Sequence, residues 1–171
     1  MVIDGAVNFL YNNPQIVITG SGKLIIEEDC ILNTWCPDRP FDGSIYVEPG
    51  GQLEVRSGAS LKVGGEGSIQ ILSGTSNNGE FILKQDATIE LSDSNSLLNI
   101  AGDLSIEDNA IFSILGDGYI KFSNPGGDAT NNIFCGSGAS IVLQGSGQND
   151  KIMEVQQSRC AINRITTLLH S

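Results

Sequence analysis

This sequence has few positive charges, few aromatic residues and almost no histidine. Its 171 residues include 9 Lys and Arg against 20 Asp and Glu, so the formal net charge is −11. An acidic chain is repelled by phosphate backbones and by anionic lipid headgroups, so we expect neither nucleic acid nor a membrane surface as its partner. The single histidine, His170, is one residue from the end, which leaves no mid-chain histidine for catalysis or metal binding.

Long hydrophobic runs and helical periodicity are also missing. No stretch approaches the ~20 apolar residues that a transmembrane helix needs, so we expect no membrane span. The opening residues, MVIDG, lack the basic start and the apolar stretch of a signal peptide. We therefore expect a segment from which a targeting signal has been removed, with a cytoplasmic protein as the alternative.

What the sequence does contain is an eight-residue repeat punctuated by glycine. Within residues 44–73, four apolar pairs begin eight residues apart, and each pair has one residue between its members. The pairs are Ile45/Val47, Leu53/Val55, Leu61/Val63 and Ile69/Ile71. Alternation with a period of two is typical of a β-strand, and glycine at a fixed offset indicates a tight turn with positive φ. A short unit repeated in this way is typical of a solenoid.

Extending this frame in both directions sorts the apolar pairs into three classes, one for each wall of a coil. The step from the second wall to the third is always eight residues, whereas the other two steps vary from 6 to 13. This pattern predicts one rigid corner and two corners that accept insertions. The first wall is expected to hold Ile16/Ile18, Ile45/Val47, Ile69/Ile71, Leu98/Ile100, Ile120/Phe122 and Met153/Val155, the second Leu24/Ile26, Leu53/Val55, Phe81/Leu83, Leu104/Ile106 and Ile133/Cys135, and the third Leu32, Leu61/Val63, Ile89/Leu91, Phe112/Ile114 and Ile141/Leu143.

Short strands separated by frequent turns also fit an antiparallel sandwich. The solenoid is favoured because the hydrophobic offset recurs without the inversion of a hairpin series, and because Asn-Gly hairpin turns are missing apart from Asn78-Gly79. The predicted organisation is an N-terminal cap at 1–14, β-helix coils at 15–155, and a terminal strand or truncated last coil at 156–171. The cap is expected because a terminal coil exposes strand edges and core.

The repeat also carries a family resemblance. Residues 45–63, IYVEPGGQLEVRSGASLKV, resemble the V-x-P-G-G-x-L-x-V-x-x-G-A-x-L units of secreted bacterial right-handed parallel β-helix proteins, and residues 103–114, DLSIEDNAIFSI, are a looser copy. The resemblance covers about residues 15–155. It implies an all-β fold, a right-handed single-stranded parallel β-helix with three walls and about five to six coils, and the hand agrees with the rule for parallel crossovers.

For function, the resemblance implies a non-catalytic module of an extracellular or cell-surface protein. Its role would be that of a structural spacer, an adhesin or a glycan-contacting surface, with a polysaccharide or a host or surface component as the partner. The same fold is shared by pectin-lyase-like polysaccharide lyases and glycoside hydrolases, so an enzyme, or a fragment of one, is the alternative.

The motifs of those enzymes are not found in the sequence. The hydrolases' Asn-x-Asp, Asp-Asp pair and Gly-His-Gly are missing. The lyases need calcium-binding carboxylates beside a basic residue on one wall, and Arg56, Arg159 and Arg164 are not expected to align with carboxylates at coil spacing. We therefore assign no catalytic residue. The question of enzyme activity is left open, with a non-catalytic role favoured, and calcium is the one cofactor left open.

Two insertions at one corner predict a ligand-facing edge. Residues 73–79, SGTSNNG, and 124–132, NPGGDATNN, fall two coils apart and hence ~10 Å apart, and loops on one side of a solenoid often form its binding face. The single tryptophan lies in the excursion at 27–44, and a tryptophan beside Arg and Asp on a loop can stack on a sugar ring. The alternatives are solvated turns without a ligand and a tryptophan folded back onto the rod. The candidate ligand-binding residues are Asn77, Asn78, Asp128, Thr130, Asn131, Asn132 and Trp35.

Four cysteines are candidates for disulfides. Cys30 and Cys36 flank a short loop, and Cys135 and Cys160 are about one coil apart, within the reach of a disulfide. The alternative is that Cys135 is a buried thiol that acts as a small hydrophobe. Zinc is not expected, because C-x5-C is not a zinc-finger spacing.

Two apolar residues occupy positions of the second wall that should face outward. These are Ile82 and Phe134, which stand where water-exposed side chains are expected. A terminal segment, a loop or a second protomer would cover them. An oligomer formed through this face is therefore left open.

Overall fold

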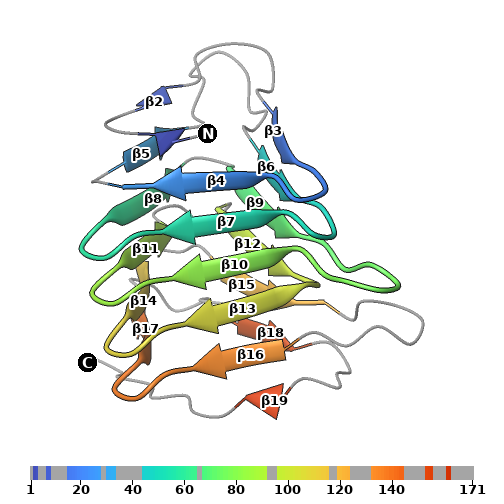
Figure 1. Cartoon of the computed structure of the whole chain (residues 1–171). Coiled ribbons are helices and arrows are strands. Elements are labelled where there is room, and N and C mark those ends of the chain that lie inside the picture. The colour runs from blue at the N-terminus through green and yellow to red at the C-terminus, as the bar shows by residue number, and fades with distance from the viewer. Residues whose placement is uncertain are drawn as a thin grey trace.

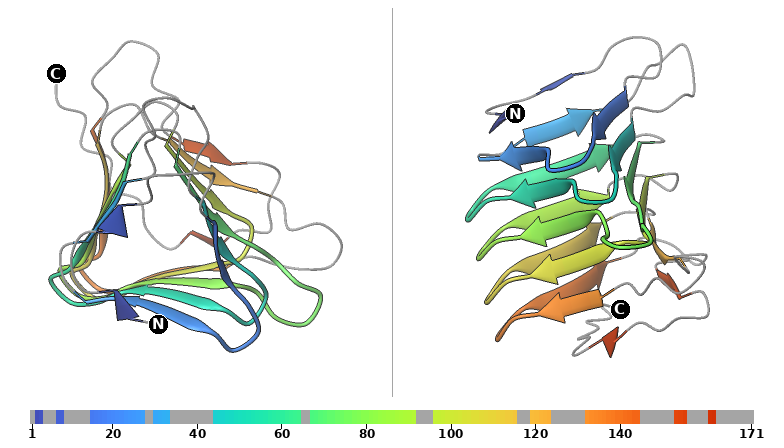
Figure 2. Two further views of the ribbon diagram at one scale, coloured as in Figure 1. Left: turned by 90° about the horizontal axis from the view of Figure 1, so that it is seen from above. Right: turned by 45° about the vertical axis from the view of Figure 1, so that its right-hand side comes forward.

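The protein folds into a three-walled, right-handed β-solenoid of about five coils (Figure 1). The computed structural model describes residues 2–3, 7–8, 15–27, 30–33, 44–64, 67–91, 96–115, 119–123, 132–144, 153–155 and 161–162. Every regular element in these ranges is a strand, and none of them contains a helix long and apolar enough to cross a membrane. Seen along its axis, the rod has a triangular section with one sheet on each side (Figure 2).

Each wall is a parallel sheet whose strands come from successive coils. The first wall contains β3 (Gln15–Ile18), β6 (Ser44–Val47), β9 (Ser68–Ile71), β12 (Leu97–Ile100), β15 (Tyr119–Phe122) and β18 (Met153–Val155). The second contains β1 (Val2–Ile3), β4 (Lys23–Ile26), β7 (Gln52–Val55), β10 (Glu80–Leu83), β13 (Asp103–Ile106), β16 (Asn132–Cys135) and β19 (Ala161–Ile162). The third contains β2 (Val7–Asn8), β5 (Cys30–Asn33), β8 (Ser60–Gly64), β11 (Thr88–Leu91), β14 (Ile111–Leu115) and β17 (Ser140–Gln144).

The strand register confirms the predicted stacking of apolar pairs. On the second wall, Leu53 lies opposite Leu24 in the coil before and Phe81 in the coil after. On the first wall, Ile45 lies opposite Ile69 in the same way. All the described pairings are parallel. The antiparallel alternative is therefore wrong, and the β-solenoid fold is confirmed.

The core is a set of apolar columns that run along the axis of the rod. Leu53, Phe81 and Leu104 form one such column and are fully buried. The residues between them in each strand face outward, because successive side chains of a strand point to opposite faces. Burial of a Leu, Ile or Phe side chain contributes about 1.5–3 kcal/mol, so these columns are the main stabilising feature of the fold.

The corner between the second and third walls, which we call the alanine corner, has the same four-residue form in four coils. It comprises residues 56–59, 84–87, 107–110 and 136–139. The third residue has positive φ, at Gly58, Asp86, Asn109 and Gly138, and the fourth is always a buried alanine whose N–H donates to the carbonyl of the first. This is the geometry of a type II turn, in which glycine and, less readily, Asn or Asp adopt the left-handed conformation. The constant eight-residue step follows from this turn.

The corner between the first and second walls, which we call the glycine corner, varies in length. In the described residues it spans 19–22, 48–51, 72–79 and 101–102 in successive coils. Glycines end it because the coils approach each other closely there: a Cβ on Gly79 would lie 2.3 Å from the Val47 carbonyl oxygen, and one on Gly102 would lie 2.3 Å from the Gly79 carbonyl oxygen. The insertion at 72–79 therefore bulges outward while the strands on either side of it stay in register.

The N-terminal segment contributes two short strands to the stack. Strand β1 pairs with β4, and β2 pairs with β5, both in parallel. The remaining residues of 1–14, and most of 156–171, lie outside the described residues. The predicted cap and terminal strand therefore stay predictions.

Candidate functional site

Two of the predicted ligand-binding residues meet at the glycine corner, and both bond to Asp103. Asn78 Nδ2 donates to Asp103 Oδ1 at 3.0 Å. Asn132 donates to the same oxygen twice, from its backbone N at 2.9 Å and from its Nδ2 at 3.0 Å. Asp103 begins the strand that lies between the coils of the two asparagines, so its side chain joins the coil before it to the coil after it.

The polar groups of Asn78 and Asn132 that make these contacts hold the corner together. Asn78 Oδ1 also accepts from Gly74 N at 3.3 Å, and its carbonyl accepts from Gly50 N at 3.0 Å. The loop at 72–79 is thereby fixed to the coils on both sides. Asn77, by contrast, is exposed, which makes it the loop's available amide for a ligand.

Several predicted residues lie outside the described part of the chain. They are Asp128, Thr130, Asn131, Trp35, Cys36 and Cys160. Cys30 lies in β5 opposite Leu61, and Cys135 lies in β16 opposite Ile106, half-buried against the core. The ligand-binding and disulfide assignments at these positions stay predictions.

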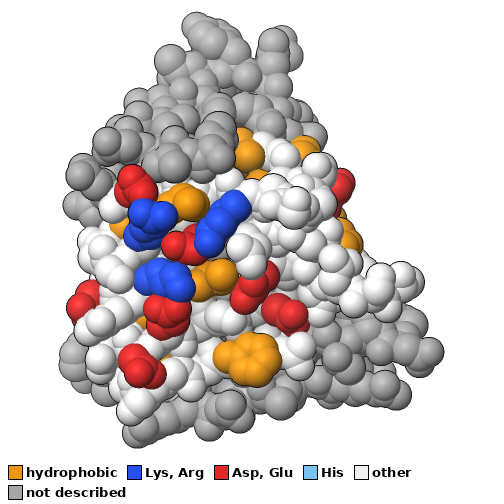
Figure 3. Space-filling model, in the orientation of Figure 1, with side chains coloured by type: hydrophobic (Ala, Val, Ile, Leu, Met, Phe, Trp, Pro, Cys, Tyr) orange, Lys and Arg blue, Asp and Glu red, His pale blue; other side chains and the backbone are white. Residues whose placement is uncertain are grey.

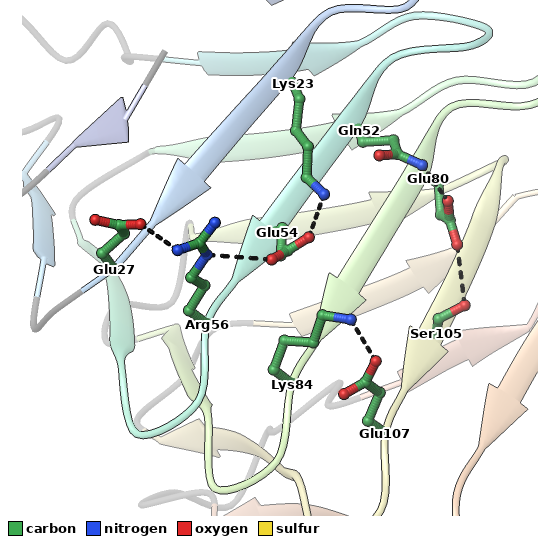
Figure 4. A network of polar contacts seen from close by, with 9 residues as sticks. All are labelled: Lys23, Glu27, Gln52, Glu54, Arg56, Glu80, Lys84, Ser105 and Glu107. Carbon is green, nitrogen blue, oxygen red and sulfur yellow. Dashed lines mark hydrogen bonds and ion pairs between the residues drawn. The ribbon is translucent and has the colours of Figure 1, made fainter.

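The second wall carries a charged outward face that spans several coils. We call it the ion-pair face, and Figures 3 and 4 show it with its cations gathered toward the N-terminal coils. Apart from the pair of Glu54 with Arg56, which lies within one coil, its contacts run along the axis of the rod from one coil to the next. Its residues are Lys23, Glu27, Gln52, Glu54, Arg56, Glu80, Lys84, Ser105 and Glu107.

Glu54 is the central residue of this face. It is only 6% exposed, and it forms ion pairs with Lys23 and, from its Oε1, with Arg56 Nε at 3.5 Å. Ile25 and Ile82 lie opposite it in the neighbouring strands, which explains its burial. Burial raises the pKa of Glu54, but the hydrogen bond from Lys23 and the surrounding cations outweigh it, so the pKa lies below its ordinary value of 4.5.

The remaining carboxylates of the face are also bonded. Glu27 pairs with Arg56, and Lys84 pairs with Glu107, whose hydrogen bond raises the pKa of Lys84 above its ordinary value of 10.5. Glu80 is held by uncharged side chains instead: it accepts hydrogen bonds from Gln52 Nε2 at 2.9 Å and from Ser105 Oγ at 3.2 Å. Each bond joins adjacent coils.

The expectation that Arg56 does not align with carboxylates at coil spacing is therefore wrong. Arg56 and Glu27 are 29 residues apart and contact each other directly. The first residue after a second-wall strand stacks on the first residue after the strand one coil earlier, so the alanine corner aligns the two side chains. Arg159 and Arg164 lie outside the described residues.

A shallow hollow of about 470 Å³ lies at the edge of the ion-pair face. It is lined by Glu27, Glu54, Arg56, Ser57 and Lys84. In this hollow two cations and a hydroxyl-bearing side chain stand beside two carboxylates. Sequence reasoning missed it because it depends on side chains from three coils, although the opposite charges at matching frame positions were a usable signal.

The apolar outward positions differ in exposure. Phe134 is 54% exposed on β16, whereas Ile82 on β10 is half-buried beside Glu54. A hydrophobic patch is visible low on the same face (Figure 3). Cover of this row by a terminal segment, a loop or a second protomer stays a prediction.

Within the described ranges, no group of three or more His, Cys, Asp or Glu side chains is placed to hold a metal ion.

Comparison with protein-family models, with curated proteins and with solved structures finds no match. The solenoid fold therefore stands on its strand pairing, and the predicted family and function remain to be tested.

Proposed function

We propose that the chain is a non-catalytic β-helix module of a secreted or cell-surface protein. It acts as a rigid spacer and presents its outward faces and corner loops to a glycan or another surface component. The observation that carries this proposal is that the outward glutamates on the second and third walls, in the described residues, form ion pairs or hydrogen bonds with side chains of an adjacent coil. Examples are the ion pairs of Glu54 with Lys23 and of Glu90 with Lys62, the latter at 2.8 Å.

This arrangement differs from what a glycoside hydrolase requires. Such enzymes place two carboxyl groups about 5–9.5 Å apart across the scissile bond, and the general acid has a raised pKa. Glu54, the most buried glutamate described, has a lowered pKa because it is held by cations. A carboxylate held ionised in this way is a poor proton donor at neutral pH, which supports a structural role for the ion-pair face.

Continuous pairing along the axis supports the role of a spacer. Three parallel ladders of backbone hydrogen bonds run through the stack, and side-chain bonds such as Asn99 Nδ2 to Gln70 Oε1 at 2.8 Å join adjacent coils on the first wall as well. A load along the rod is therefore shared by many bonds in parallel.

The proposal is tested by offering the protein a panel of neutral and acidic polysaccharides and by measuring both retention and cleavage. Retention is followed by affinity electrophoresis, and cleavage by the release of reducing ends and by the ultraviolet absorbance of unsaturated products. We expect retention of one or more polysaccharides without cleavage.

The matched variants are Glu54→Gln and Glu90→Gln, which remove one paired carboxylate from each of two walls. Cleavage by the unaltered protein would overturn the proposal, and its loss in one of the two variants would assign the reaction to that carboxylate. If no polysaccharide is retained, the glycan-contacting part of the proposal fails and the spacer role is left to stand on the fold.

A further inference from the structure

Arg56 is held in a fixed position at the hollow and still has donors to offer. A guanidinium group has five N–H donors in a planar fork. The contacts with Glu54 and Glu27 engage Nε and one Nη, so the other Nη keeps both of its donors uncommitted among the described residues. Because the two glutamates hold the group from two sides, little side-chain entropy is lost when it binds a ligand.

Two further donors line the same hollow. Lys84 Nζ bonds to Glu107 and has two more N–H donors than that contact uses. The hydroxyl of Ser57 follows Arg56 directly in the alanine corner, and both line the hollow with Lys84. An ammonium, a hydroxyl and the free edge of a guanidinium therefore surround one depression of about 470 Å³.

We propose that this hollow, the Arg56 hollow, binds one oxyanion group, a carboxylate or a sulfate. Arginine forms paired N–H···O bonds with such groups, and lysine and serine add single donors. The charges of Glu27 and Glu54 in the lining balance those of Arg56 and Lys84. Because the hollow has no net charge, it attracts an anion only at hydrogen-bonding distance. We therefore expect weak binding, with a dissociation constant on the order of 10 mM for a small ion.

The test is a titration of the intact protein with sodium acetate and, separately, with sodium sulfate, at constant ionic strength kept with sodium chloride. Amide and Arg Nε chemical shifts are recorded by NMR. We expect shifts that saturate at Arg56, Ser57 and Gly58 and not at residues of the third wall. A lower dissociation constant for acetate assigns the hollow to carboxylates, and a lower dissociation constant for sulfate assigns it to sulfates.

The decisive variant is Arg56→Gln, and the matched control is Lys62→Gln, which removes a cation that is also paired with a glutamate but does not line the hollow. Arg56→Gln should raise the dissociation constant at least tenfold, and Lys62→Gln should leave it unchanged. If Arg56→Gln does not give a folded spectrum, Lys84→Gln takes its place with an expected rise of about threefold.

Chemical shifts that change linearly with the concentration of both ions, or equal losses of affinity in Arg56→Gln and Lys62→Gln, would overturn the proposed site. This result is separable from the proposed function. Cleavage of a polysaccharide would refute the non-catalytic module without touching the oxyanion site, and the absence of saturation would refute the site without touching the module.

Discussion

The alanine corner and the glycine corner meet the same requirement, a change of direction between two stacked strands, by different means. The alanine corner repeats one turn in which a left-handed residue precedes a buried alanine. The glycine corner has no fixed turn, and where the structure describes it the length ranges from the two residues at 101–102 to the eight at 72–79. A corner is therefore rigid where its side chain packs inward, and it accepts insertions where only the glycine that ends it must fit.

The largest effect should come from a Cβ at the end of the glycine corner. In Gly79→Ala the new atom would lie 2.3 Å from the Val47 carbonyl oxygen, so the backbone must move. We expect the free energy of unfolding to fall by about 3 kcal/mol, at the upper end for overpacking. Urea denaturation followed by circular dichroism measures it.

The control is Gly58→Ala in the alanine corner, where no heavy atom lies within 4 Å of the added Cβ but φ is +74°. Left-handed backbone costs a non-glycine residue about 1–2 kcal/mol, so the loss should be smaller. Equal losses of unfolding free energy in Gly79→Ala and Gly58→Ala would mean that close approach of the backbone does not distinguish the two corners.

The next effect concerns the carboxylate that fixes the longest described insertion. Asp103→Ala removes the acceptor of three donors from Asn78 and Asn132, and lost partners of partly buried groups cost about 1–3 kcal/mol. The unfolding free energy should fall by that amount, and the Asn132 amide should exchange with solvent faster.

Asp108→Ala is the counterpart in the alanine corner, where Asp108 Oδ1 accepts a single hydrogen bond from the described residues, from Ser137 N at 2.7 Å and at an exposed site. Its cost should be about 0.5 kcal/mol, the low end for a single hydrogen bond. A larger loss for Asp108→Ala than for Asp103→Ala would reverse the comparison.

A smaller effect is expected from the left-handed position of the alanine corner. Asn109 has a φ of 60°, which asparagine tolerates better than alanine does. Asn109→Ala should destabilise the protein by about 1 kcal/mol, and Asn109→Gly should not. Thermal unfolding of the two variants measures this, with Gln85→Ala, an exposed position of the same corner, as the substitution that should change nothing.

The smallest effect is a change in pH dependence on the face between the two corners. The pKa of Glu54 is lowered by folding, so its contribution to stability is present above its ordinary value of 4.5 and is lost as the pH falls through the folded value. Glu54→Gln should therefore flatten the decrease in unfolding free energy between about pH 5 and pH 3. Identical slopes in the unaltered protein and in Glu54→Gln would contradict the assignment.

The sequence alone predicts the walls because a buried column forces each coil to repeat the same alternation. The positions of Leu53, Phe81 and Leu104 in the frame determine which residues stack. The length of the alanine corner is equally predictable, since its step is eight residues in every coil, but an eight-residue step does not fix the turn: at 19–22 and 48–51 the left-handed glycine stands second in one turn and third in the other.

The candidate sites were less predictable. Alternation shows that Arg56 and Glu27 face outward but does not show which neighbour each one bonds, because that depends on side-chain conformation. The role of Asp103 was missed because insertions of unequal length separate it from Asn78 and Asn132 in the sequence. Opposite charges at equal frame positions in adjacent coils are the signal that would have revealed the ion-pair face.

The parallel register has a consequence for how the protein comes apart. Because each coil contacts only the coils before and after it, the stack behaves as a one-dimensional array of coupled units. Unfolding should begin at the two ends and move inward, so amide exchange should slow steadily from the terminal coils to the central one. Asp103 interrupts this gradient, since it joins three successive coils through its side chain and makes them open as one unit.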